Sequence, residues 1–220
     1  MNPETNFSIK CLKGGFDNNL SYLVSCSHTG NQVIVDASNQ LAKISKYVHH
    51  SPDAILITHT HKDHLYYLKE YMEAYPKMAI VGHPDSESLS KQKNFQAIGD
   101  NQEFKCGQLK FISIHTPGHY YDSISYLIKP ALFTGDTMFV GRTGRVISNG
   151  SNIEDLYHSV YAKILQISKN VRIYPGHDYG EEPSILLGKN IEMSPLLQAN
   201  DLEDFKRRMQ NYEASRKPDA

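Results

Sequence analysis

A run of histidines and aspartate directly after a short apolar segment constrains this chain more than any other feature. Residues 54–58 have the composition of a strand buried in a sheet, and they are followed by His59-x-His61-x-Asp63-His64. Side chains two residues apart on an extended segment point to the same side, so His59 and His61 can bind one metal ion. Where the chain bends into the following helix, Asp63 and His64 face a neighbouring point and can serve a second ion. We therefore expect a metal site at the end of this strand.

Three more candidate ligands occur later in the chain, and each follows an apolar strand that ends in glycine. His119 follows Thr-Pro-Gly, Asp136 follows Phe-Thr-Gly, and His177 follows Tyr-Pro-Gly. Glycine permits a tight turn, so each side chain is expected to project from a strand end. Any one of these residues alone is more typical of a turn. Together with the histidine run, they predict one site with seven donors: His59, His61, Asp63, His64, His119, Asp136 and His177.

The rest of the pattern predicts short strands and helices along the whole chain. Apolar runs between turn residues predict strands at 7–12, 20–26, 32–36, 54–58, 77–81 and 171–174, and a hairpin of 103–106 with 109–115. Helical spacing of apolar residues predicts helices at 41–48, 65–74, 85–92 and 153–167, and a mostly helical segment at 183–212. Ser38 is the expected N-cap of the first helix.

Two hairpins have similar sequences and indicate that the chain contains two similar halves. Ser-Tyr-Leu-Val at 21–24, leading to Val-Asp at 35–36, resembles Ser-Tyr-Leu-Ile at 125–128, leading to Gly-Asp at 135–136. Two halves of this kind, each a sheet with helices on its outer side, predict a four-layer α/β sandwich. The strand ends of the two halves would meet in a cleft.

The charge balance excludes several classes of partner. The 220 residues include 23 Lys and Arg against 24 Asp and Glu, so no broad basic field attracts nucleic acid or an anionic membrane. No stretch approaches the roughly 20 apolar residues that span a bilayer, and residues 1–10 are polar and contain no apolar run with a cleavage site. We expect a cytoplasmic protein that acts on a small molecule. The sequence leaves its oligomeric state open.

The donor pattern resembles the metallo-β-lactamase superfamily, in which H-x-H-x-D-H is followed by His, Asp and His. The likeness extends from about Phe7 to Tyr179. It implies a four-layer αβ/βα sandwich of two mixed sheets at residues 1–180, with 181–220 as a short helical extension packed on the same domain. It also implies two divalent ions, with zinc expected and iron or manganese as alternatives. The resemblance assigns His59, His61 and His119 to the first ion, Asp63, His64 and His177 to the second, and Asp136 as the bridge.

Within this superfamily the chain resembles glyoxalase II, which hydrolyses S-acyl-glutathione thioesters. Residues 135–140 and 175–179 are close to motifs of that group. By this resemblance, Arg145 occupies the position of a lysine that contacts glutathione, and Tyr179 matches a tyrosine facing the thiol carrier. Ile147 replaces another expected tyrosine. Arg142 is a further candidate to bind a carboxylate of the substrate.

The resemblance implies hydrolysis of a thioester, with a lactone or another ester as an alternative substrate. Two ions roughly 3.5–4 Å apart would share a water, lower its pKa towards about 7 and supply a metal-bridging hydroxide. Asp63 and Asp136 are candidate catalytic residues, since both hold metal and Asp136 can accept the proton. Asp36, at the end of the first repeated hairpin, is a candidate outer carboxylate that orients a ligand histidine.

A second enzyme class shares this fold and the same seven positions. Persulfide dioxygenases bind a single iron through the equivalents of His59, His119 and Asp136. That group tends to follow its Gly-Arg-Thr with Asp-Phe, whereas residues 141–146 here read Gly-Arg-Thr-Gly-Arg-Val. The difference favours the hydrolase and leaves the dioxygenase as the alternative.

Overall fold

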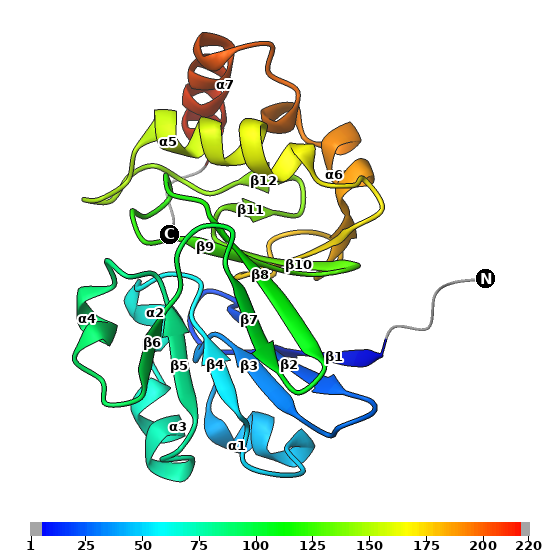
Figure 1. Ribbon diagram of the computed structural model, residues 1–220. Helices are drawn as coiled ribbons and strands as arrows, with labels where there is room; N and C mark the ends of the chain where they lie inside the picture. Colours follow the sequence, from blue (N-terminus) through cyan, green and yellow to red (C-terminus); the bar gives the residue numbers. More distant parts are fainter. Residues whose placement is uncertain (1–5, 217–220) are drawn as a thin grey trace.

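Short apolar strands build two six-stranded sheets that pack face to face, as the computed structural model of residues 6–216 shows (Figure 1). The first sheet has the order β1-β2-β3-β4-β5-β6, with bounds Phe7–Lys13, Leu20–Cys26, Gln32–Val35, Ala54–Leu56, Ala79–Gly82 and Phe95–Ala97. The second has the order β14-β13-β10-β9-β8-β7. In chain order its strands are β7 Glu103–Cys106, β8 Leu109–His115, β9 Ile124–Ile128, β10 Ala131–Gly135, β13 Arg172–Pro175 and β14 Ile185–Leu186.

Both sheets contain parallel and antiparallel pairs, and they have related arrangements. In the first sheet an antiparallel hairpin, β2–β3, is followed by the parallel partner β4; in the second, the hairpin β9–β10 has the parallel partner β13. Every residue of β3, β4 and β10 is buried, as expected for strands covered on both faces. The predicted sandwich of two mixed sheets is confirmed.

Helices cover the outer face of each sheet. In Figure 1, α1 Leu41–Ile44 and α3 Leu68–Ala74 lie below the first sheet, and α5 Ile153–His158, α6 Leu187–Met193 and α7 Leu202–Ser215 lie above the second. The short helices α2 Lys62–Leu65 and α4 Glu87–Ser90 follow strands of the first sheet, and a small hairpin joins β11 Met138–Phe139 to β12 Arg142–Thr143. None of the helices in residues 6–216 has the length and apolar composition needed to cross a bilayer.

Three apolar cores hold these layers together. The central core lies between the sheets and includes Tyr22, Phe111, Tyr126 and Phe133. A second core joins the second sheet to its helices, and the third joins the first sheet to α1 and α3. In the second core the ring of Phe205, from α7, lies 5.6 Å from that of Tyr157, from α5. Burial of aromatic rings on this scale provides much of the stability of a domain of this size.

Hydrogen bonds between the sheets are placed symmetrically in the two halves. Tyr22 of β2 donates its hydroxyl to the carbonyl of Pro175 at 2.6 Å, and Tyr126 of β9 donates to the carbonyl of Ile57 at 2.9 Å. The first residues of the same strands repeat the pattern through the backbone: the amide of Leu20 donates to Gly176 and that of Ile124 to Thr58, both at 2.7 Å. In each case the acceptors are the two residues that precede a histidine, His177 or His59. Each sheet therefore fixes a histidine-bearing loop of the other sheet.

Several local expectations differ from the structure. Ser38 is not an N-cap: the helix begins after Gln40, and the hydroxyl of the buried Ser38 has no hydrogen-bond partner among the described residues. The helix predicted at 65–74 begins later, as α3 at Leu68, because Leu65 ends the separate short helix α2 and the chain turns at residues 66–67. The segment predicted as mostly helical from residue 183 first forms β14, which pairs with β13 at the sheet edge. The strands β6, β11 and β12 were not predicted, since they are only two or three residues long.

We predict that removing either tyrosine hydroxyl destabilises the fold. Tyr22→Phe and Tyr126→Phe each withdraw the hydroxyl donor from a buried carbonyl while keeping the packed ring, so each should lower the free energy of unfolding by about 1–2 kcal/mol. Urea denaturation measures this change. Tyr66→Phe is the matched control, because Tyr66 is 58% exposed. Cross-sheet variants as stable as this control would contradict the prediction.

Candidate metal centre

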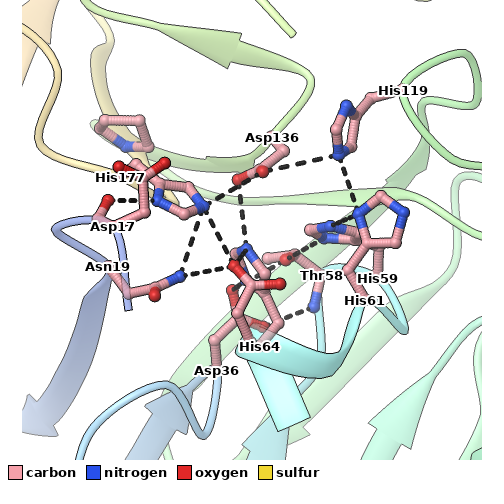
Figure 2. Close-up of polar contacts among 12 residues, drawn as sticks. Asp17, Asn19, Asp36, Thr58, His59, His61, His64, His119, Asp136 and His177 are labelled. Atoms are coloured by element: carbon pink, nitrogen blue, oxygen red, sulfur yellow. Dashed lines mark hydrogen bonds and ion pairs between the residues drawn. The ribbon is translucent and has the colours of Figure 1, made fainter. Parts of the chain in front are cut away.

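The structure brings all seven predicted donors to one edge of the sandwich, where strand ends of both sheets meet (Figure 2). The loop after β4 carries His59 and His61, and the first turn of α2 carries Asp63 and His64. Three loops of the second sheet supply the others: His119 follows β8, Asp136 follows β10 and His177 follows β13. The donors therefore lie where the carboxyl ends of β4, β10 and β13 converge.

One group of donors consists of three imidazoles. Nδ1 of His61 lies 3.0 Å from Nε2 of His59 and 3.0 Å from Nε2 of His119. The ligand atoms of these residues lie within 4.8 Å of one another. Nitrogen atoms around a tetrahedral zinc ion are roughly 3.3 Å apart, which is close to the observed spacing. This group can hold one metal ion.

A second group combines a carboxylate with two imidazoles. Oδ2 of Asp63 lies 3.3 Å from Nε2 of His177 and 3.5 Å from Nε2 of His64. His64 is fully buried and His177 is 4% exposed, so both rings are fixed by their surroundings. These three residues form a separate potential ligand group.

Asp136 lies between the two groups. Its Oδ2 is 3.5 Å from Nε2 of His119 and 3.3 Å from Nε2 of His177, and its Oδ1 is 3.3 Å from Nε2 of His64. A carboxylate has two oxygens with several lone pairs, so it can face two cations at once. The position of Asp136 allows it to serve both groups.

The carboxylates of the centre are ionised, as metal binding requires, whereas the imidazoles divide into a neutral set and a positively charged set. Burial, followed by repulsion from His119, lowers the pKa of His61 to about 4. Burial opposes ionisation of Asp136, yet His177 and His64 hold its pKa well below the usual range. Burial also disfavours a charged His177, but Asp136 raises its pKa to about 10. Asp136 thus attracts positive charge to its surroundings. A bound metal cation can supply this charge in place of a proton on His177.

Buried atoms without hydrogen bonds support the same conclusion. Nε2 of His64 and Oδ1 of Asp136 lie 3.3 Å apart, yet neither atom has a hydrogen-bond partner within residues 6–216. A Cβ atom on Gly176 would lie 2.3 Å from Oδ1 of Asp136 and 2.7 Å from Cε1 of His64, so only glycine fits beside them. Buried polar atoms are normally satisfied, and unsatisfied ones often mark a site for an ion. The donors fit a metal.

Asp36 supports the histidine loop from below. Its Oδ2 lies 2.8 Å from Nδ1 of His64 and accepts from the hydroxyl of Thr58 at 2.8 Å, while its Oδ1 accepts from the amide of Thr58 at 2.8 Å. The contact with Nδ1 leaves Nε2 of His64 facing the donors (Figure 2). Asp36 therefore lies where it orients the His64 ring.

Sequence reasoning missed several residues that hold the donors in place. The amide of buried Asn19 donates to Asp63 at 2.9 Å, and the carbonyl of Asp17 accepts from Nδ1 of His177 at 2.8 Å. Both belong to a turn in which Asp17 has a φ of 45°, and the sequence showed it only as a turn. Buried Asp122 accepts from the amide of Thr60 at 3.2 Å, from its hydroxyl at 2.7 Å and from Ser86 at 2.8 Å. It thereby fixes the residue between His59 and His61.

A cavity of about 630 Å³ lies over the donors and contains the three predicted substrate-binding residues. The guanidinium of Arg142 stacks 4.0 Å above the ring of Tyr179, and the hydroxyl of Tyr179 donates to Asp17. Arg145 also lines the cavity but is paired with Glu213. Ile147 is 66% exposed at its rim. The cavity wall is thus aromatic and cationic, with apolar side chains at the edge.

The fold and the donor set define a metallo-hydrolase. Residues 14–177 match the family model for the metallo-beta-lactamase superfamily, and the chain belongs to that superfamily. It is 30% identical over 191 residues, 85% of each chain, to the probable polyketide biosynthesis zinc-dependent hydrolase BaeB of Bacillus velezensis. It is 29% identical to the hydroxyacylglutathione hydrolase of Klebsiella pneumoniae, covering 91% of this chain and 76% of that protein. The crystal structure of ETHE1 from Myxococcus xanthus has a TM-score of 0.82 at 25% identity, covering 93% of this chain and 91% of that one.

We predict that Asp36→Asn weakens zinc binding by about 10–100-fold, because an amide cannot keep all three contacts of the carboxylate. Competition of the metal-free protein with a chromophoric chelator measures the affinity. Asp53→Asn is the control, since Asp53 also accepts a backbone amide, that of Gln32, but lies outside the centre. Equal affinities in the two variants would contradict the role given to Asp36.

Proposed function

We propose that the seven donors hold two divalent metal ions and that the protein hydrolyses a thioester. The observation that carries this proposal is the position of Asp136 within 3.5 Å of ligand atoms from both histidine groups. The names of similar proteins also favour hydrolysis, and those named hydroxyacylglutathione hydrolase favour an S-acyl-glutathione as one candidate substrate.

The proposed ligand sets follow the two groups in the structure. His59, His61 and His119 would hold the first ion, and Asp63, His64 and His177 the second, with Asp136 on both. Zinc is the proposed metal, supported by the words "zinc-dependent hydrolase" in the name of a similar protein. Nitrogen and oxygen donors also suit iron and manganese.

Such a pair of ions, when bound, would lower the pKa of a bound water towards about 7 and supply hydroxide at neutral pH. The protein's own residues would accept the proton, keep Asp63 ionised and contact the substrate. Asp136 is oriented by its contacts with His64 and His177, and in this proposal its carboxylate would accept the proton that the attacking water loses. Asn19 and His177 hold Asp63 ionised, because hydrogen bonds to a carboxylate lower its pKa. Tyr179 stacks on His177 at 4.9 Å and forms the wall along which the thiol carrier would lie.

We predict that Asp136→Ala removes metal and activity together, since it takes away the carboxylate shared by the two groups. Metal content by mass spectrometry and thiol release from S-lactoylglutathione measure the two effects, and turnover should fall at least about 100-fold. Asp85→Ala is the control, because the Asp85 side chain is 74% exposed. An Asp136→Ala protein with wild-type metal content and turnover would show that the assignment of the centre is wrong.

Elemental analysis of protein purified without added metal separates the two enzyme classes. The proposed hydrolase should contain two equivalents of zinc and release thiol from a thioester. One equivalent of iron, with oxygen uptake on glutathione persulfide, would instead support a dioxygenase that uses His59, His119 and Asp136. If the protein hydrolysed a lactone but no thioester, the proposed metal centre would stand and the proposed substrate class would be wrong.

A further inference from the structure

Three arginines line the cavity over the metal centre, namely Arg142, Arg145 and Arg216, and residues at the end of α7 contact Arg142 and Arg145 in different ways. Nε of Arg145 donates to both carboxylate oxygens of Glu213 at 3.1 Å, and its Nη2 donates to Oε2 at 2.8 Å. The planar guanidinium fork that could bind a substrate carboxylate is therefore already bound to a carboxylate of the protein. An anionic group of a substrate can use Arg145 only by displacing Glu213.

Arg142, in contrast, contacts aromatic side chains and not a carboxylate in the described part of the chain. Its guanidinium lies over the ring of Tyr179 and donates to the hydroxyl of Tyr212 at 2.6 Å. Within residues 6–216 no carboxylate pairs with Arg142, and its buried Nε has no hydrogen-bond partner. Neutral aromatic contacts leave the positive charge of Arg142 uncompensated. Arg142 thus remains available to an anion that enters the cavity.

Asp17 adds negative charge to the cavity. The carboxylate of Asp17 lines the same cavity and accepts the hydroxyl of Tyr179. Like charges in a partly enclosed space repel each other, so Asp17 and Glu213 both disfavour a substrate with several anionic groups.

We infer that Glu213 is a specificity-determining residue: it occupies Arg145 and selects thioesters whose carrier thiol presents no carboxylate at that position. This inference rests on the proposed thioester hydrolysis and narrows its substrate class. Arg145 and Glu213 are 32% and 27% exposed in their side chains, so the pair weakens binding of a substrate carboxylate there without abolishing it.

Two thioesters with the same acyl group test the inference. S-lactoylglutathione carries two carboxylates in its thiol carrier, and S-lactoyl-N-acetylcysteamine carries none. The measured quantity is the ratio of kcat/KM for the first substrate to that for the second. Glu213→Gln frees Arg145 and should raise this ratio about fivefold at low salt, mainly through a lower KM for S-lactoylglutathione. The double variant Glu213→Gln/Arg145→Gln should lose this gain, because the freed guanidinium is gone.

Controls separate the inference from the proposed function. Glu203→Gln, on the same helix and 81% exposed, should keep the wild-type ratio. Because both substrates are compared on one preparation, partial unfolding of a variant cancels in the ratio. If the neutral thioester is hydrolysed but Glu213→Gln leaves the ratio unchanged or lowers it, the inference is wrong and the proposed function stands. If no variant and no wild-type preparation hydrolyses either thioester, the proposed function fails and the inference fails with it.

Discussion

The metal centre depends on hydrogen bonds by which each sheet fixes a loop of the other. Tyr22 and Leu20 hold the carbonyls before His177, and Tyr126 and Ile124 hold those before His59. Five of the seven donors come from loops, which by themselves position ligand atoms less precisely than helices or strands do. Because each loop is hydrogen-bonded to the opposite sheet, the packing of the two sheets determines the positions of the donors.

The similar hairpins β2–β3 and β9–β10 are each followed by an aspartate, and the two aspartates have different roles. Val35 lies opposite Tyr22, and Asp36 follows it directly, so its carboxylate stays beneath the loop and contacts His64. Phe133 lies opposite Tyr126, and a register shift after it allows Asp136 to extend to the middle of the centre. One repeated aspartate therefore orients a ring while the other faces both groups of ligands.

The C-terminal helix links the fold to substrate choice. Phe205 anchors α7 in the core above the second sheet, and the last turns of this helix place Tyr212 and Glu213 against the arginines of the cavity. In the proposed hydrolase, a change in this helix would alter which thioester is preferred without touching the donors. Substrate selectivity and metal binding would then depend on different layers of the sandwich.

The sequence by itself determined the donor set and the two-sheet architecture, because both depend on local patterns: apolar runs that end in glycine, histidines two residues apart, and a repeated hairpin. It misplaced the N-cap at Ser38 and did not reveal the very short strands, where tertiary packing outweighs local preference. Only the tertiary structure decided that Arg145 is bound by Glu213, 68 residues away, and that Asn19 holds Asp63, 44 residues away. These contacts join residues that are brought together only by the layers of the fold, so no local spacing predicts them.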